Sequence, residues 1–231
     1  EDIRRPVSLI TPILVVAAPV ALVFRQPDLG TGLILLITAA GLFFLAGVRI
    51  WKFALVAVTA LVSAPIAWQF LHEYQRRRIM TFFDPESDPL GAGYHIIQSK
   101  IAFGSGGLSG RGFMQGTQTR LNFLPEKHTD FIFSVVGEEL GFLGTMAAIL
   151  GFAFILTRLV RMAEESPDPF AGLVLLGILG AWLVHIFVNV GMTVGVVPIT
   201  GIPLPFVSYG GTFLLMSWVA VAIAVRVAHE R

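Results

Sequence analysis

Six long apolar stretches dominate the sequence, and they restrict its possible folds more than any other feature does. They cover residues 7–24, 28–48, 53–70, 131–157, 170–188 and 208–226. A helix that crosses a bilayer needs about 20 predominantly apolar residues, so each stretch can span or nearly span a membrane. Charged residues make up 13% of the chain, against roughly 25% in a soluble domain. We therefore predict an all-α, polytopic membrane bundle with about six transmembrane helices.

Basic residues at the ends of the apolar stretches predict how the chain lies in a membrane. They are Arg4, Arg5, Arg49, Lys52, Arg158, Arg161, Arg226 and Arg231. Because they fall at alternate helix ends, the positive-inside rule places these ends, and with them the C-terminus, in the cytoplasm. The connection at 25–28, the long segment 71–130 and the loop 189–207 are then extracytoplasmic. The chain opens on Glu1 instead of Met, so we expect that preceding sequence is missing.

The charge balance and the lack of cysteine exclude several functional classes. The formal net charge is +1, and the sixteen Lys and Arg residues are spread over loops and helix ends. A nucleic-acid-binding protein presents a concentrated basic face, so we expect no nucleic-acid partner. A chain with no cysteine has neither disulfides nor thiolate metal sites.

Residues 71–130 form a long connection in a chain that is otherwise joined by short turns. Connections of this length are usually functional or disordered. The stretch 94–103 has the apolar spacing of a helix that lies on a membrane surface, and a glycine-rich turn region follows at 104–112. We therefore predict an ordered, functional extracytoplasmic loop that contains membrane-surface helices and carries aromatic and basic side chains.

Three consecutive arginines, Arg76, Arg77 and Arg78, lie just beyond the third apolar stretch. In one interpretation they belong to an interfacial helix and meet lipid phosphates. In the other they form a site for an anionic substrate on the outer face. The sequence leaves both interpretations open.

Several acidic residues lie around the start of the fourth apolar stretch. Thr129 is expected to cap this helix, and Asp130 to complement its positive end. For Asp130 to act as a general base, either its surroundings must raise its pKa from the reference value near 3.9, or the reaction must ionise it near a pre-polarised hydroxyl. Glu138 and Glu139 lie inside the apolar span, where acids face the bundle interior or a water-filled cavity. Either a structural hydrogen-bond network or catalysis would explain them, and Glu126 could line the same site as Asp130.

The stretch 189–211 packs glycines and prolines between two apolar stretches, so it cannot be a regular helix throughout. Irregular backbone at membrane depth is tolerated only where it is buried in protein or lines a cavity. It is therefore either a tight connection with close helix packing at Gly210 and Gly211, or a re-entrant cavity wall that includes Ser208 and Tyr209.

Five motifs, in this order, resemble those of the shape, elongation, division and sporulation (SEDS) family. They are QPDLGT (26–31), DPESDPLGAGYHIIQSKIAFGSGGLSGRG (84–112), LPEKHTDFIF (124–133), EELG (138–141) and PLPFVSYGG (203–211). The forms GIPLPFVSYGG and YQRRRIMTFFDPESDP are more similar to the elongation members than to the division or sporulation members.

The resemblance implies a peptidoglycan glycosyltransferase that polymerises lipid II into β-1,4 glycan strands on the outer face of the bacterial cytoplasmic membrane. It implies one transmembrane domain over residues 1–231, with about four of the family's ten spans missing at the N-terminus. The aspartate of the HTDFIF motif, regarded in the family as the essential catalytic residue, falls on Asp130.

The resemblance also implies ligands and partners. The leaving undecaprenyl diphosphate would be held by a divalent cation (Mg or Mn) or by basic residues. The candidates are Lys100, Arg111, Lys127 and the cluster of Arg76, Arg77 and Arg78. The implied partners are membrane lipid, a class B penicillin-binding protein and other proteins of the elongation complex.

Two other functions remain open from the sequence. A lipid II flippase would depend on mid-membrane residues such as Glu138 and would need no base at Asp130. A scaffold that recruits a transpeptidase would need neither residue for chemistry.

Overall fold

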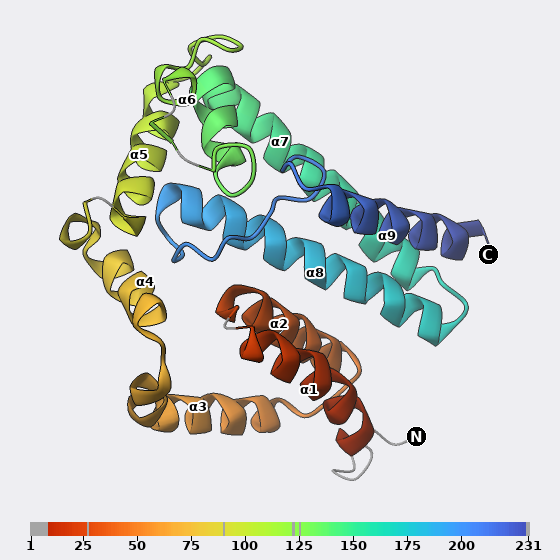
Figure 1. Cartoon of the computed structure of the whole chain (residues 1–231). Coiled ribbons are helices and arrows are strands. Elements are labelled where there is room, and N and C mark those ends of the chain that lie inside the picture. Colours follow the sequence, from red (N-terminus) through yellow and green to blue (C-terminus); the bar gives the residue numbers. More distant parts are fainter. Residues whose placement is uncertain (1–8, 27, 90, 122, 125, 230–231) are drawn as a thin grey trace.

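The computed structural model describes residues 9–26, 28–89, 91–121, 123–124 and 126–229, and in these ranges its regular secondary structure is helical, with no strand. Figure 1 shows the arrangement of the elements. In chain order they are α1 (Ile10–Arg25), α2 (Leu29–Leu45), α3 (Ile50–Phe70), α4 (Glu73–Phe83), η2 (Pro85–Ser87), α5 (Ala92–Ser105), α6 (Thr117–Arg120), α7 (Ile132–Glu164), α8 (Pro169–Val194) and α9 (Gly211–His229).

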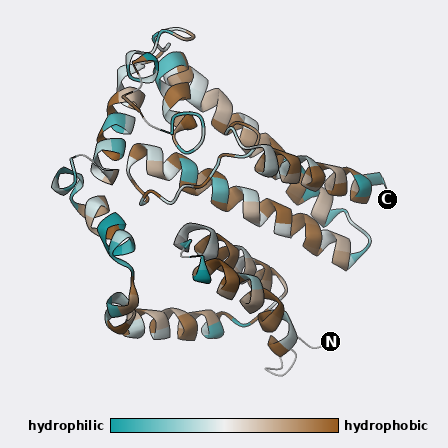
Figure 2. Cartoon of the chain, in the orientation of Figure 1, coloured by the Kyte–Doolittle hydropathy of each residue, from teal (hydrophilic) through white to brown (hydrophobic). Residues whose placement is uncertain are grey.

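Each of the six apolar stretches forms a helix, which confirms the predicted all-α membrane architecture. Four of these helices, α3, α7, α8 and α9, are long and apolar enough to cross a bilayer. The helices α1 and α2 are shorter, with 16 and 17 residues. Figure 2 shows hydrophobic residues along all six, and hydrophilic residues concentrated on α4 and at the helix ends.

The connections of the bundle separate into two ends, as the alternating charges predict. In Figure 1 the connections at 46–49 and 165–168 lie at the same end as the start of α1 and the end of α9. The end of α1 and the start of α2, the described residues of the segment 71–131, and the segment 195–210 lie at the opposite end, which we call the loop end. Arg4, Arg5 and Arg231 are outside the described residues. Which end faces the cytoplasm stays a prediction.

Helix α8 lies at the centre of the bundle and packs against α7, α2 and α5. The segment 195–210, which follows α8, is not helical, as its glycines and prolines predict. It runs back into the bundle, where Ile202 packs with Val184 and Val188, and Leu204 packs with Phe133. Ile202, Leu204 and Ser208 of this irregular segment are buried, so the segment is anchored to the bundle at the loop end.

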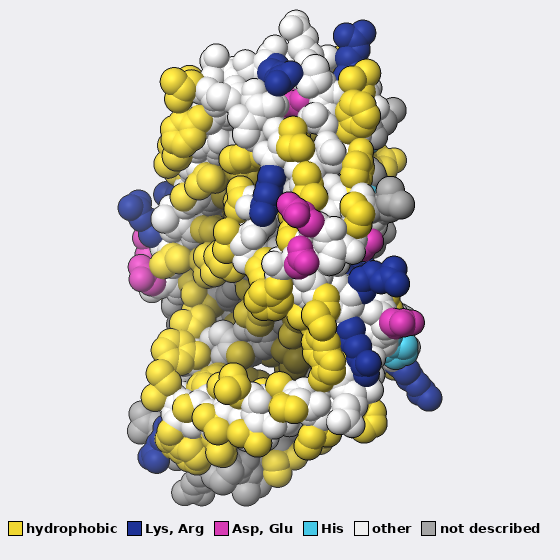
Figure 3. Space-filling model, turned by 90° about the vertical axis from the view of Figure 1, so that its left-hand side faces the viewer, with side chains coloured by type: hydrophobic (Ala, Val, Ile, Leu, Met, Phe, Trp, Pro, Cys, Tyr) yellow, Lys and Arg dark blue, Asp and Glu magenta, His cyan; other side chains and the backbone are white. Residues whose placement is uncertain are grey.

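Helix α3 stands apart from the rest, since none of its residues is buried. Its Phe53 ring meets the Phe44 ring of α2 edge-on, with 6.1 Å between ring centroids. A helix that is apolar on all sides suits a lipid environment. Figure 3, which looks onto the loop end, shows a hollow lined by hydrophobic side chains there.

Helix α7, which contains the predicted span at 131–157, is kinked at Gly141 (φ 64°, ψ −160°). The carbonyls of Glu138 and Glu139, freed by the kink, accept hydrogen bonds from the backbone N–H groups of Arg111 and Gly112 at 2.9 and 3.0 Å. Beyond the kink, the N–H groups of residues 142 and 143 donate to the carbonyls of residues 107 and 108. The glycine-rich segment 104–112 thus replaces the hydrogen bonds that the helix loses.

Candidate active site

Asp130 lies in a closed turn ahead of α7, and the prediction that it opens a helix capped by Thr129 is wrong. Helix α7 begins at Ile132, and its N-cap is Phe131, without a side-chain cap. The N–H groups of residues 129, 130 and 131 all donate to the carbonyl of Glu126, at 3.1–3.2 Å. The Thr129 hydroxyl donates to the Glu126 carboxylate at 3.1 Å. The chain therefore completes a separate turn, 126–131, before the helix starts.

The other side of this turn is bound by α8 and by the segment 195–210. Three consecutive carbonyl oxygens, those of residues 128, 129 and 130, each accept a hydrogen bond. The donors are the Tyr209 N–H at 2.8 Å, the Ser208 hydroxyl at 2.7 Å and the Asn189 amide at 3.0 Å. The N–H groups of the turn thus form hydrogen bonds within it, and its carbonyls accept hydrogen bonds from outside it. Together these bonds fix the backbone position from which the Asp130 side chain projects.

The surroundings of Asp130 raise the pKa of its carboxyl above the usual 3.8. Partial burial is the main cause, because it disfavours the charged form, and the negative charge of Glu126 acts in the same direction. The hydrogen bond from Thr129 and the charges of Arg78 and His95 oppose this rise. A carboxyl with a raised pKa is a better proton acceptor, as the base chemistry requires.

A polar pocket of about 410 Å³ adjoins this turn. It is lined by Gln26, Asp28, Tyr74, Arg78 and Thr200. Asp130 lies beside Gly201, the residue after Thr200, since a Cβ placed at Gly201 would be 3.6 Å from Asp130 Oδ2. Asp28 caps α2 by accepting hydrogen bonds from the N–H and hydroxyl of Thr31 at 3.1 and 2.7 Å. The QPDLGT motif thus shapes one wall of a pocket next to Asp130.

The three arginines of α4 do not act as one cluster. Arg76 donates to the carbonyls of Trp68 and Gln69 at 3.0 and 2.8 Å, so it binds the last turn of α3. Arg77 is exposed to the surroundings of the bundle. Arg78 lies over the Tyr74 ring, 5.8 Å from its centroid, and lines the polar pocket. Only Arg78 is therefore brought toward Asp130.

The other candidate cations lie against different parts of the chain. The Lys100 side chain lies against Gly195, at the end of α8. Arg111 donates to the Ser105 carbonyl at 3.3 Å and to the Thr117 hydroxyl at 2.9 Å. The Lys127 ammonium donates to the Thr119 carbonyl at 2.6 Å. These contacts hold the loops together, and none of them is with Asp130.

Glu138 and Glu139 lie on the first arm of α7, away from the Asp130 turn. Glu138 is fully buried, and its carboxylate accepts hydrogen bonds from the N–H groups of Gln118 and Thr119 at 2.8 and 3.0 Å. The Thr119 hydroxyl adds a third at 2.6 Å. Glu139 is 9% exposed. The contacts of Glu138 match the structural network considered from the sequence, since they anchor α6 to α7.

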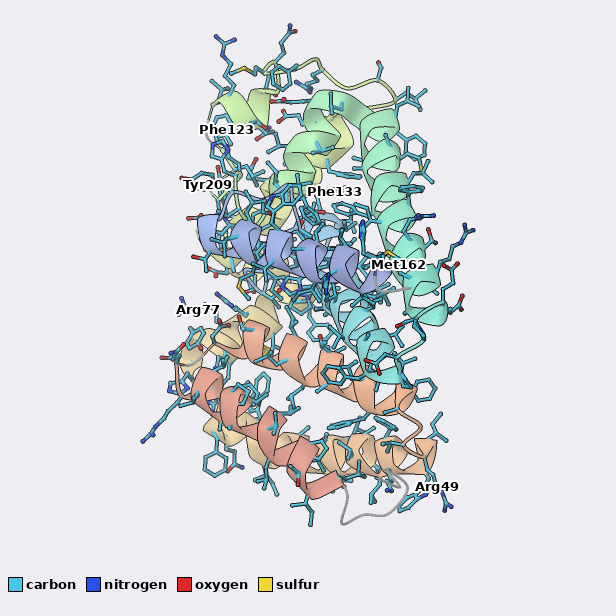
Figure 4. The ribbon with its side chains drawn as sticks, turned by 90° about the vertical axis from the view of Figure 1, so that its right-hand side faces the viewer. Arg49, Arg77, Phe123, Phe133, Met162 and Tyr209 are labelled. Atoms are coloured by element: carbon cyan, nitrogen blue, oxygen red, sulfur yellow. The ribbon has the colours of Figure 1, made fainter. Side chains whose placement is uncertain are left out.

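Ser208 and Tyr209 have different environments. The Ser208 hydroxyl is buried under the Asp130 turn, whereas the Tyr209 side chain is 80% exposed. Figure 4 shows Tyr209 at the edge of the bundle and Phe133 inside it. Both Ser208 and Tyr209 line a second pocket, of about 370 Å³, together with Ile132 and Leu214. This pocket lies between the Asp130 turn and the start of α9.

Sequence reasoning missed two residues at this site, Asn189 and His95. Asn189 is the single asparagine in the apolar α8, and a polar side chain in such a helix is itself a signal of a buried contact. His95 stacks on Phe131, with 6.3 Å between ring centroids. No group of three metal-binding side chains occurs among the described residues.

The chain is similar to known proteins over nearly all of its length. Residues 3–231 match the family model of FtsW, RodA and SpoVE, described as "Cell cycle protein". The chain is 45% identical to peptidoglycan glycosyltransferase MrdB of Escherichia coli K12, over 95% of this chain and 60% of that protein. The chain thus spans about 60% of the length of that curated relative.

Solved structures support the same assignment. One, described as "Structural coordination of polymerization and crosslinking by a peptidoglycan synthase complex", matches with a TM-score of 0.80 and 33% identity, over all of this chain and 64% of that one. Rod shape-determining protein RodA of Thermus thermophilus matches with a TM-score of 0.65 and 26% identity, over 98% of this chain and 58% of that one. The chain therefore belongs to the FtsW, RodA and SpoVE family, the SEDS family that its motifs resemble.

Proposed function

We propose that the protein is a peptidoglycan glycosyltransferase of cell elongation that polymerises lipid II, with Asp130 as its general base. The observation that carries the proposal is the Asp130 carboxyl, which has a raised pKa and lies beside a polar pocket that contains Arg78. The relative MrdB is named a peptidoglycan glycosyltransferase. The reaction needs a base and a positive charge near each other, and this site has both.

In the proposed reaction, Asp130 removes the proton from the 4-hydroxyl of the acceptor glucosamine. That oxygen attacks the anomeric carbon of the muramyl diphosphate lipid from the face opposite the diphosphate. The bond from this carbon to the diphosphate oxygen breaks, and undecaprenyl diphosphate leaves with the electron pair. The attack converts an α-linked donor into a β-1,4 linkage. One base suffices, because a diphosphate whose charge is neutralised leaves without a proton.

Arg78 is the residue we assign to the diphosphate. It is the cation that lines the polar pocket, and its charge acts on Asp130. A guanidinium presents several donors in a plane and binds phosphate oxygens in pairs. A divalent cation that arrives with the substrate would add to this charge.

The proposed setting is the bacterial cytoplasmic membrane, with the loop end outside and the C-terminus in the cytoplasm. Segment 71–130 then presents the active site to lipid II on the outer face. The solved complex that the chain resembles couples polymerisation with crosslinking. We therefore propose a class B penicillin-binding protein as the partner.

The test is glycan polymerisation from purified lipid II by the full-length protein with its cognate transpeptidase. Asp130→Asn should reduce the rate by about 10²–10⁴-fold, the usual contribution of a general base. Asp168→Asn is the matched control. Asp168 caps α8 at the other end of the bundle by binding the N–H groups of Phe170 and Ala171. Asn caps a helix as well as Asp does, so this variant should keep its activity.

The outcomes separate the proposed function from its rivals. Polymer from Asp130→Asn at the wild-type rate would refute the base assignment. A wild-type complex that makes no polymer but moves lipid II across vesicles would favour the flippase. A protein that does neither, and still binds the transpeptidase, would favour the scaffold.

A further inference from the structure

Asn189 joins the Asp130 turn to the irregular segment that follows α8. Its Nδ2 donates to the Asp130 carbonyl at 3.0 Å and to the Ile202 carbonyl at 2.7 Å. The side chain is fully buried. Ile202 follows Gly201, the residue beside which the Asp130 carboxylate lies. One amide group therefore holds together the two backbone segments that flank the carboxylate.

Ser208 makes a second link of the same kind. Its hydroxyl donates to the Thr129 carbonyl at 2.7 Å and accepts a hydrogen bond from the Leu204 N–H at 2.7 Å. The residue is 5% exposed. Asn189 and Ser208 thus bind two consecutive carbonyls of the turn. Asn189, on α8, also binds Ile202 of the segment 195–210, whereas Ser208 belongs to that segment and is held within it by Leu204.

These links matter because the turn 126–131 has no regular secondary structure to orient it. Its own N–H groups converge on the Glu126 carbonyl. These hydrogen bonds close the turn but do not fix its orientation relative to the helices. The direction in which Asp130 projects therefore depends on donors from outside the turn. A displacement of about 1 Å at a catalytic group can cost about 10²-fold in rate.

We propose that Asn189 and Ser208 are positioning residues, which fix the Asp130 carboxylate beside the polar pocket by holding the carbonyls of residues 129 and 130. This inference rests on the proposed function, since it assigns the two residues to the catalytic step. Both act through the backbone of the turn and do not contact the substrate. Their loss should therefore lower kcat and leave KM for lipid II nearly unchanged.

The chain offers a matched control for each residue. Thr193 lies one turn after Asn189 on α8 and is also fully buried, but its hydroxyl donates to Val190 within the same helix. Ser217 is 2% exposed, and its hydroxyl donates to Phe213 within α9. Thr193→Ala and Ser217→Ala thus remove a buried hydroxyl without releasing the Asp130 turn.

The first measurement is steady-state polymerisation by the full-length complex. Asn189→Ala and Ser208→Ala should each lower kcat by about tenfold or more, with KM for lipid II within about twofold of wild type. Thr193→Ala and Ser217→Ala should stay close to wild type in both constants. Equal rates in the test and control variants, or a rise in KM with kcat unchanged, would overturn the proposal.

The second measurement does not depend on activity. Hydrogen–deuterium exchange should be faster in the peptide that covers 126–131 for Asn189→Ala and Ser208→Ala, and unchanged for the two controls. Unchanged exchange in the test variants would overturn the proposal even if their activity falls. If the test variants match the controls while Asp130→Asn is inactive, the positioning role fails and the proposed function stands. If wild type makes no polymer, the proposed function fails, and exchange still decides whether the two residues hold the turn.

Discussion

At the scale of single residues, Asp130 is a carboxylate placed where its charge is disfavoured. Partial burial and Glu126 raise the pKa of its carboxyl, and the opposing effects of Thr129, Arg78 and His95 are smaller. Folding therefore favours the protonated form of this side chain. The ionised form, which the proposed base chemistry needs, costs stability, and catalytic groups are often held in such unfavourable environments.

Asp130→Asn should raise the melting temperature of the purified protein at neutral pH. The folded-state pKa lies above the unfolded value, so the favourable contribution of the carboxyl is present below the ordinary pKa, 3.8, and is lost as the pH rises through the folded pKa. The difference in melting temperature between Asp130→Asn and wild type should therefore vanish below about pH 4, where Asp130 is protonated in both the folded and the unfolded state. Melting curves of both proteins across this range measure it, and an Asn variant less stable at neutral pH would contradict the assigned burial effect.

At the scale of secondary-structure elements, the kink in α7 is built by two segments together. Gly141 takes a backbone conformation that side chains other than glycine rarely adopt, and a Cβ there would be 2.8 Å from the Leu108 carbonyl oxygen. The segment 104–112 supplies the replacement hydrogen bonds. The glycines of this segment therefore permit a close contact between two backbones, in addition to forming a turn.

Gly141→Ala should destabilise the protein by about 1–3 kcal/mol through backbone strain alone, with the clash against residues 107–110 adding to it. Gly151→Ala is the control. Gly151 lies on the same helix, and a Cβ there meets nothing within 4 Å. Because Ala is preferred to Gly in a helix by about 1 kcal/mol, the control should be neutral or slightly stabilising. Thermal unfolding of both variants in the same detergent tests this. Equal melting temperatures would show that the backbone conformation at residue 141 does not require glycine.

At the scale of the whole molecule, the two ends of the bundle differ in chemistry. The loop end carries the Asp130 turn, the polar pocket and α4 to α6, and the opposite end carries short connections (Figure 1). The proposed reaction needs the loop end outside, where lipid II is polymerised. Arg49 and Arg77 are exposed and lie at opposite ends of α3 and its connections, so they report on sidedness.

Single-cysteine variants test this orientation, because the sequence has no cysteine of its own. In intact cells whose outer barrier is permeable to the reagent, a membrane-impermeant maleimide should label Arg77→Cys. Arg49→Cys should react only after the cytoplasmic membrane is opened. Labelling of Arg49→Cys in intact cells would reverse the orientation and place Asp130 on the wrong side for lipid II polymerisation.

Much of the fold follows from properties that are local in the chain. Runs of apolar residues predict helices whether or not their partners are known, and all six were found. The irregular segment after α8 also follows locally, since glycine and proline disfavour a helix wherever they lie. The motif that contains Asp130 was found from the sequence as well, but its place in a separate turn was not.

The contacts that make the site depend on residues far apart in the chain. Asn189 and Asp130 are 59 positions apart, and Ser208 and Thr129 are 79 apart. Likewise, the sequence gives no reason to choose among the three consecutive arginines at 76–78. Only the packing of α4 places Arg78 at the pocket and Arg76 against α3. The sequence by itself determined a helical membrane protein of the SEDS family with an acid at residue 130. Only the tertiary structure decided which charges and donors surround that acid, because hydropathy and propensity act along the chain, whereas burial and hydrogen bonding arise between helices.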